Sequence, residues 1–174
     1  MSKNCIAVFD SKSSSNSGKI SGYVSLHQCS LVASTKIRIK LSGFKPGTTH
    51  GIHIHEFGDL SEGCLSACSH YSIPGQLHGS ISLFGKSRHI GDLCSNITAD
   101  STGKVDFVYQ DELVNLSGPY SVVGRMIVIH DKPDDLGRYR YENNERGRES
   151  AKTGNAGKRI ACAVIGLSRT DFCD

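Results

Sequence analysis

The chain has 174 residues, 21% of them charged, and a formal net charge of +3. This length is typical of a single domain, here residues 1–174, that is large enough to bury a core. No apolar run reaches the roughly 18 residues that a membrane-spanning helix needs, and the net charge is too small to indicate a nucleic-acid-binding protein. The N-terminus lacks the apolar segment of a signal peptide, which predicts a cytoplasmic protein.

Strand patterns dominate the chain, and no helical periodicity is visible. Residues 35–42 alternate between apolar and mostly basic side chains, so one face of that strand is expected to enter a core. Short strands separated by glycine-rich connections favour an all-β sandwich or barrel. The expected strands, in chain order, cover residues 5–9, 20–27, 35–42, the segment around His53, 104–110, 122–130 and 160–168.

Two segments do not fit this strand pattern. Residues 56–92 and 131–158 are far longer than ordinary connections, and loops of that length are usually functional or disordered. The first is rich in histidine and the second in charged residues. Loops this long need tethers, which a metal ion or a disulfide bond can supply.

The motif GIHIHEFGD at residues 51–59 places two histidines one residue apart. In a strand, residues i and i+2 point to the same face, so His53 and His55 lie side by side while Ile54 points to the opposite face. Two adjacent imidazoles form half of a site for zinc, copper, iron or nickel. The alternative for this motif alone is a pair of half-exposed polar residues on an edge strand.

Further histidines strengthen the prediction of a metal site. His70, His78, His89 and Asp92 have the residue types of a four-coordinate zinc site. His130 ends an apolar run, where a strand would bring its side chain back toward the same centre. Six of the eight histidines thus fall into two potential groups of ligands.

Several long motifs together resemble the copper,zinc superoxide dismutases. They are GIHIHEFGD, the following Cys64, RHIGD, VVGRMIVIHDKPDDLG and KTGNAGKRIACAVIGL, in this order. The resemblance extends from residue 4 to residue 168. It implies an eight-stranded Greek-key β-barrel, flattened like a sandwich, with two long functional loops. It also implies an enzyme that converts superoxide to dioxygen and hydrogen peroxide by redox cycling of copper.

The resemblance assigns ligands to two metal ions, copper and zinc. Zinc has one oxidation state and would be structural, and His70 would bridge the two ions as an imidazolate. The implied copper ligands are His53, His55, His70 and His130. The implied zinc ligands are His70, His78, His89 and Asp92.

The resemblance also implies roles for residues around the metals. Arg159 matches the arginine that attracts and orients the superoxide anion. His70 would supply a proton to peroxide, so Arg159 and His70 are the expected catalytic residues. Asp134 matches an aspartate that links His53 to His78 and fixes both rings.

Other implied contacts are structural. Arg88 and Asp111 match an ion pair near the zinc-binding loop. Cys64 and Cys162 match a disulfide bond that ties the first long loop to the last strand. Closing a loop of that length removes unfolded-state entropy equivalent to about 4–5 kcal/mol.

The other cysteines are expected to be reduced, as is usual in the cytoplasm. A second disulfide between Cys68 and Cys94 is a hypothesis, because each lies two residues from an expected zinc ligand and the two backbones must therefore approach each other. Cytoplasmic reduction and the strict geometry of disulfides oppose it. Of the remaining histidines, His50 is expected to be structural and His27 to lie on the surface.

Two alternatives to the enzyme are open. One is a catalytically inert or copper-chaperone-like module on the same fold, which the complete ligand set and Arg159 oppose. The other is an RNA- or anion-binding role for residues 138–149, which is opposed because four arginines and three glutamates there nearly cancel in charge.

The family resemblance also implies partners. Superoxide is the expected substrate, and a homodimer is expected, with contacts that include the first strand and the last. Neither neighbour of Arg159 is a proline, which predicts that the Cys64–Cys162 disulfide forms without a copper chaperone. A protein of viral origin would be expected in the host cytoplasm or the virion.

Overall fold

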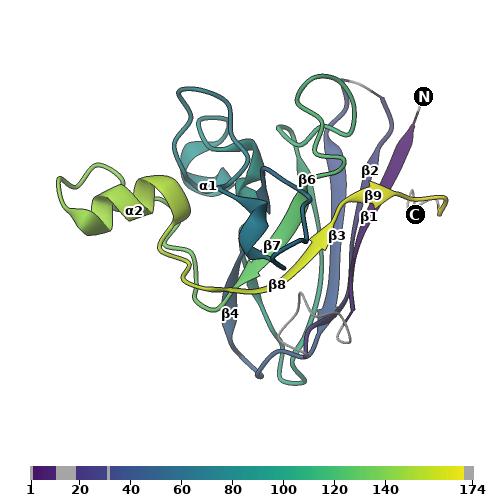
Figure 1. Cartoon of the computed structure of the whole chain (residues 1–174), viewed down its shortest axis with the longest axis horizontal. Coiled ribbons are helices and arrows are strands. Elements are labelled where there is room, and N and C mark those ends of the chain that lie inside the picture. The colour runs from purple at the N-terminus through teal and green to yellow at the C-terminus, as the bar shows by residue number, and fades with distance from the viewer. Residues whose placement is uncertain (1, 11–18, 31, 171–174) are drawn as a thin grey trace.

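The computed structural model describes residues 2–10, 19–30 and 32–170. These residues form two antiparallel β-sheets that enclose a common core (Figure 1). The first sheet has the strand order β6-β3-β2-β1-β9 and the second has the order β5-β4-β7-β8. The first sheet contains β1 (Lys3–Phe9), β2 (Ser21–Gln28), β3 (Thr35–Ser42), β6 (Lys104–Asp111) and β9 (Gly166–Leu167). The second contains β4 (Thr49–His55), β5 (Ser95–Thr98), β7 (Met126–His130) and β8 (Arg159–Val164). The all-β sandwich expected from the sequence is confirmed.

The described residues contain nine strands where eight were expected, in part because the expected last strand is divided. β8 belongs to the second sheet, whereas β9 pairs with β1 in the first, with Leu167 opposite Cys5. Between them the fully buried Ile165 exchanges backbone hydrogen bonds with Gly124 and Arg125. The chain therefore crosses from one sheet to the other, and a single strand cannot follow that path.

Two further differences concern weak local patterns. β5 was not expected, because only Ile97 in this short polar segment is apolar. β7 begins at Met126 rather than at residue 122. The residues before it form a turn, in which Arg125 N donates to Val122 O and Gly124 has a φ of 82°. A positive φ suits glycine and interrupts a strand.

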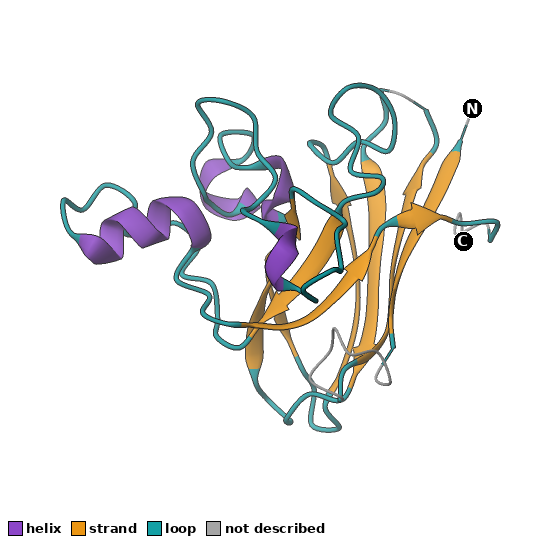
Figure 2. Cartoon of the chain, viewed as in Figure 1, coloured by secondary structure: helices purple, strands orange, loops and turns teal. Residues whose placement is uncertain are grey.

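The second long loop contains a helix that the sequence pattern did not indicate. α2 (Glu145–Thr153) begins at Asn144, whose side chain accepts a hydrogen bond from Gly147 N, and ends at Gly154 in the left-handed conformation. Both ends therefore have ordinary capping residues. The helix is too polar to show an apolar stripe, so its periodicity is hidden. Figure 2 shows it projecting away from the strands.

The first long loop contains shorter helical segments. They are the 3₁₀ turns Leu65–Ala67 and Ile90–Asp92 and the helix α1 (Ile81–Phe84). None of the helices in the described part of the chain is long and apolar enough to cross a membrane.

Alternating side chains divide each sheet into a core face and an outer face. In β3, Ile37, Ile39 and Leu41 are buried, as the sequence pattern predicted. Ile52 of β4 and Ile129 of β7 lie opposite each other and join the same core. The intervening residues of β4 and β7 therefore point to the outer face of the second sheet.

A smaller apolar cluster lies on that outer face. It consists of Ala67, Met126, Val128 and Cys162, with Cys64 packed against it. Ala67 belongs to the first long loop, so this loop is anchored over the outer face of the second sheet. The histidines of β4 and β7 are thereby enclosed between a sheet and a loop.

Candidate metal centre

Three of the predicted histidines come from adjacent strands of the second sheet. His53 and His55 alternate with the core residues of β4, and His130 ends β7. The ring centroids of His53 and His130 are 5.0 Å apart, and those of His55 and His130 are 5.6 Å apart. Strand alternation and sheet pairing together place these three rings on one face.

The first long loop adds His70 to this group. The loop returns to β4 through a bridge between His55 and His70 and through a 2.8 Å hydrogen bond from Tyr71 N to Ile54 O. The His53 and His70 ring centroids are 4.0 Å apart. Each member of the group His53, His55, His70 and His130 offers one nitrogen, and these atoms lie within 4.8 Å of one another.

The second predicted group surrounds Asp92. Its Oδ1 lies 3.1 Å from His70 Nδ1, 2.8 Å from His78 Nδ1 and 3.3 Å from His89 Nδ1. Its Oδ2 accepts hydrogen bonds from the backbone N–H groups of Gly79 at 2.9 Å and His89 at 3.0 Å. All four side chains are buried, with ligand atoms within 4.8 Å of one another. His70 belongs to both groups.

Asp134 lies between the two groups. Its Oδ2 is 2.6 Å from His53 Nε2, and its Oδ1 is 2.8 Å from His78 Nε2. Gly154 allows this contact, because a Cβ there would lie 2.1 Å from Asp134 Oδ1. The residue at position 154 must therefore be glycine for the carboxylate to stay between the two rings.

The sequence interpretation missed the residue that holds Asp134 in place. Asn96 Nδ2 donates to Asp134 O at 2.9 Å, and Asp134 N donates to Asn96 Oδ1 at 2.8 Å. Asn96 lies outside every motif that carries the family resemblance. No local pattern connects two residues that are 38 positions apart.

Five ring nitrogens in these groups are buried and have no hydrogen-bond partner in the described residues. Buried polar atoms are rarely left without a partner, so such a concentration indicates an ion-binding site. The other nitrogens of His55 and His130 are held by the carbonyls of Cys68 and Gly157, at 2.9 Å and 3.1 Å. The partnerless atoms are His53 Nδ1, His55 Nε2, His70 Nε2, His89 Nδ1 and His130 Nε2.

The protonation of the rings matches this interpretation. Burial lowers the pKa of His53, His55 and His70 well below the usual value for histidine, and burial also lowers that of His130. Neutral imidazole is the form that binds a metal ion. The donor set of imidazoles and one carboxylate suits copper and zinc.

His78 differs because it touches two carboxylates. Burial opposes its charged form, but hydrogen bonds with Asp134 and Asp92 outweigh burial and raise its pKa to about 10. Burial would raise the pKa of Asp92, but its contacts with His70, His78 and His89 hold that pKa well below the usual value. Without a metal ion, a proton on His78 therefore links the two carboxylates.

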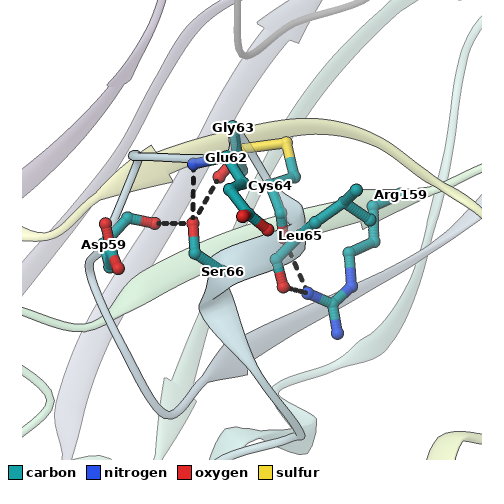
Figure 3. Close-up of a disulfide and its surroundings, with 8 residues drawn as sticks. Asp59, Glu62, Gly63, Cys64, Leu65, Ser66 and Arg159 are labelled. Carbon is teal, nitrogen blue, oxygen red and sulfur yellow. Dashed lines mark hydrogen bonds between the residues drawn. A yellow bond between two sulfur atoms is a disulfide. The ribbon is translucent and has the colours of Figure 1, made fainter.

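Arg159 lies at the edge of the first group and contacts the first long loop. Its Nη1 donates to the carbonyls of Cys64 at 2.6 Å and Leu65 at 3.0 Å, and its Nη2 donates to the carbonyl of Cys68. Figure 3 shows the guanidinium reaching the carbonyls of Cys64 and Leu65 beside the disulfide. The predicted Cys64–Cys162 disulfide is present, with a Cα–Cα distance of 5.7 Å.

A cavity of about 400 Å³ opens next to the first group. It is lined by side chains of both signs of charge and by three of the histidines. The charged residues Lys132, Glu149 and Arg159 come from the second long loop and β8. The histidines are His55, His70 and His130.

The two loops also contact each other through a cation–π interaction that the sequence did not indicate. The Arg140 guanidinium lies 3.5 Å from the centroid of the Phe84 ring, and its Nη1 donates to His78 O at 3.2 Å. Phe84 belongs to α1, so each loop supplies one half of the contact. Arg88 and Asp111 form the expected buried ion pair, at 2.8 Å.

One hypothesis and one expectation were wrong. Cys68 and Cys94 do not form a disulfide: Cys68 is exposed, whereas Cys94 packs against the main core, and burial raises the pKa of its thiol to about 12. His27 is not a surface residue, since only 4% of it is exposed. His50 lies outside both histidine groups. Its Nδ1 donates to His130 O, and its Nε2 lies 2.9 Å from Thr48 Oγ1, so its role is structural.

An all-β sandwich with two adjacent groups of buried imidazole and carboxylate ligands defines a class of protein that can hold two metal ions. A family model for copper/zinc superoxide dismutase matches residues 20–165. The chain belongs to the copper/zinc superoxide dismutase family.

Individual relatives are similar over most of the chain. A Cu-Zn superoxide dismutase of Paramecium bursaria Chlorella virus 1 is 47% identical over 138 residues, which cover 79% of this chain and 69% of the relative. One from Candida glabrata is 46% identical and covers 87% of this chain and 93% of the relative. An extracellular one from Drosophila melanogaster is 40% identical and covers 88% of this chain and 79% of the relative. The crystal structure of the clock protein EA4 superposes with a TM-score of 0.80 at 34% identity and covers 95% of both chains.

Proposed function

We propose that this single-domain protein dismutates superoxide, converting two superoxide anions and two protons to dioxygen and hydrogen peroxide. The observation that carries the proposal is the set of five buried, partnerless imidazole nitrogens, which converge in the two groups. Copper supplies the one-electron redox chemistry when it is bound, and zinc supplies fixed geometry and charge. Family membership supports the same reaction.

The two groups divide between the two metals according to their composition. The all-imidazole group suits copper, and the group with one carboxylate suits zinc. Asp134 orients one ring of each group. The proposed copper ligands are His53, His55, His70 and His130, and the proposed zinc ligands are His70, His78, His89 and Asp92.

Arg159 binds and orients the substrate anion in this proposal. Its guanidinium keeps its charge and borders the cavity beside His55 and His130. The hydrogen bonds to the loop carbonyls hold the charge in place before the substrate arrives, so little reorganisation is needed. Lys132 adds a second cation to the cavity wall, and Glu149 opposes it.

His70 is the proposed proton donor. Its Nε2 is buried, has no partner in the described residues and faces the first group, while its Nδ1 is held near Asp92. A proton held at Nε2 can therefore pass to peroxide in the cavity, which His70 also lines. The enclosed position keeps this transfer short and directed.

The alternative of an inert or copper-chaperone-like module is not favoured. Such a module could dispense with several of the ligands or with the cation at the cavity, whereas this chain has all seven proposed ligand residues and Arg159 in place. The long loop at 138–149 packs against the proposed zinc group through Arg140, which favours a structural role over RNA binding.

The direct test combines metal analysis with an assay of superoxide consumption. Protein loaded with one copper and one zinc per chain is expected to consume superoxide at a rate that an equal concentration of zinc-only protein does not reach. A matched His55→Ala variant, which removes one proposed copper ligand and no zinc ligand, should retain zinc and lose copper. Equal rates for the copper-loaded and zinc-only proteins would refute the proposal.

We also propose that the protein is a homodimer. Four large apolar side chains on or near β1, the start of the first loop and β9 are exposed, between 45% and 69%. A contact between copies would cover them. Sedimentation at micromolar concentration should give twice the chain mass. The side chains are Val8, Phe57, Leu60 and Leu167.

A cytoplasmic location and chaperone-independent maturation complete the proposal. Cys29 and Cys68 are exposed free thiols, which are typical of a reducing compartment. Fractionation of the producing cells would test the location. Thiol trapping in cells that lack the copper chaperone should still recover the Cys64–Cys162 disulfide, and recovery of only the reduced form would contradict this.

A further inference from the structure

A cysteine, a histidine and an asparagine form a hydrogen-bonded row on the first sheet, which carries none of the proposed metal ligands. Cys29 Sγ lies 3.0 Å from His27 Nε2, and His27 Nδ1 lies 2.5 Å from Asn4 Oδ1. A nucleophile, a base and a group that orients the base are the three parts of an activated nucleophile. Dismutation uses none of them.

The sheet itself brings the three residues together. His27 is the register partner of Asn4, so the two side chains project from the same face of β1 and β2. β2 ends at Gln28, and Cys29 follows His27 by two residues, which returns its side chain to that face. His27 is only 4% exposed, whereas Cys29 is exposed. The imidazole that would act as the base is therefore shielded, whereas the cysteine that would act as the nucleophile is exposed.

The hydrogen bonds determine which nitrogen is basic. The Asn4 Oδ1 can only accept, so His27 Nδ1 carries the ring proton and Nε2 presents its lone pair to the sulfur. The Cys29 thiol then donates to Nε2. Transfer of this proton yields a thiolate beside an imidazolium, a pair that stabilises itself by charge.

Charged residues also occur on the neighbouring strands. Lys36 of β3 lies opposite His27 in the sheet register, and Lys3 of β1 precedes Asn4. Glu112, beyond the end of β6, is paired with Lys86 at 2.8 Å.

We propose that Cys29 is a peroxide-reactive thiol that His27 activates and Asn4 positions. The source of peroxide rests on the proposed function, because dismutation releases hydrogen peroxide. The thiolate sulfur attacks one peroxide oxygen, the S–O bond forms and the O–O bond breaks. Sulfur is oxidised by two electrons to the sulfenic acid, and the departing hydroxide takes the proton from the His27 imidazolium and leaves as water.

Alkylation by iodoacetamide tests the activation step, with the labelled peptides measured by mass. The exposed Cys68 serves as a reference within the same metal-loaded protein. Cys29 is expected to react about tenfold faster than Cys68 at pH 7, because His27 Nε2 is in place to accept its proton. His27→Gln should remove this advantage, and Asn4→Leu should reduce it. His50→Gln, which changes a structural histidine elsewhere, should leave it unchanged.

The pH profile separates activation from a structural role. The ratio of the Cys29 rate to the Cys68 rate should be greatest at about pH 6 and should fall as the pH rises to about 9, because His27 accepts the Cys29 proton. Equal rates for Cys29 and Cys68 from pH 6 to pH 9 would overturn the inference. This comparison needs only the unaltered protein, so it decides the matter even where His27→Gln fails to fold.

Addition of hydrogen peroxide with dimedone tests the oxidation step. Dimedone should label Cys29, and the label should fall about tenfold in His27→Gln. Because peroxide is added directly, the result does not depend on dismutation. Absence of label on Cys29 in an active dismutase refutes only this inference, and label on Cys29 in a protein without superoxide consumption refutes only the proposed function.

Discussion

At the scale of single residues, the rings of the candidate centre are oriented by contacts with groups that are not themselves proposed ligands. His55 and His130 donate from Nδ1 to backbone carbonyls, and His53 and His78 contact Asp134. A carbonyl can only accept, so in His55 and His130 the opposite nitrogen must present its lone pair inward. The ligand atoms are thus selected by contacts outside the two groups.

Arg159 provides a test at this scale. Replacement by alanine removes the fixed cation beside the cavity, so superoxide consumption should fall roughly ten- to a hundredfold. Copper and zinc contents should stay the same, because Arg159 belongs to neither ligand group. Arg159→Lys keeps the charge but not the planar fork of donors, and its rate should be intermediate.

The measurement is a rate of superoxide consumption per bound copper, with thiol trapping as a check. That check matters because Arg159 also contacts the carbonyl of Cys64. Full activity in Arg159→Ala with an intact disulfide would show that Arg159 does not bind the anion.

At the scale of elements, the disulfide connects the first long loop to β8. Its two cysteines are 98 positions apart, so reduction frees a very long loop in the unfolded chain. Cys162→Ser should lower the free energy of unfolding by about 4–5 kcal/mol in the chain-entropy model. Urea unfolding of the two proteins in the same metal state measures the difference.

The matched control for this prediction is Cys29→Ser, which changes an exposed cysteine without breaking the disulfide. Its free energy of unfolding should stay within about 1 kcal/mol of the unaltered protein. A similar loss in both variants would mean that the disulfide contributes little beyond the loss of any one cysteine.

The contact between Arg140 and Phe84 joins the two long loops. Arg140 also donates to His78 O, so it supports a proposed zinc ligand from outside. Arg140→Ala removes a cation–π contact and a hydrogen bond, together worth about 1–2 kcal/mol. Zinc should therefore leave about tenfold faster when a chelator is added.

Absorbance of a chromogenic chelator follows this release. Arg148→Ala is the control, since Arg148 is an exposed arginine of α2 in the same long loop. Its zinc should leave at the original rate. Equal acceleration in both variants would point to a general effect of charge in the second long loop, and no acceleration in Arg140→Ala would remove the supporting role.

At the scale of the whole molecule, the stability of the metal-stripped protein should depend on pH in both directions. Burial lowers the pKa of His53, His55 and His70, so stability should be lost as the pH falls below about 6.5. The pKa of His78 is raised to about 10, despite burial, by Asp134 and Asp92. Its contribution is complete below about pH 6.5 and should be lost as the pH rises toward 10.

The free energy of unfolding should therefore be greatest near neutral pH and should change by up to about 1.4 kcal/mol per pH unit for each group. Urea unfolding between pH 5 and pH 10 after chelation measures it. His78→Gln should remove the alkaline decline and leave the acid decline. A stability that keeps rising above pH 8 would contradict the prediction.

Sequence patterns alone predicted the features that depend on local periodicity and residue type. The alternation in residues 35–42 predicted the buried face of β3, and the spacing of His53 and His55 predicted that the two rings share a face. The resemblance to a known family extended this to the remaining members of both groups and to the disulfide. The two strand features could be predicted from the sequence because side-chain direction in a strand repeats every two residues.

Only the tertiary structure decided features that join distant segments. Asn96 holds Asp134 across 38 positions, and Arg140 meets Phe84 across the two loops. The division of β8 from β9 follows from a crossing between sheets, and α2 is too polar for its periodicity to show. Cys68 and Cys94 remain apart because one is exposed and the other packs into the core. A linear pattern reports which face a residue takes on its own element, whereas these contacts depend on the path of the backbone between elements.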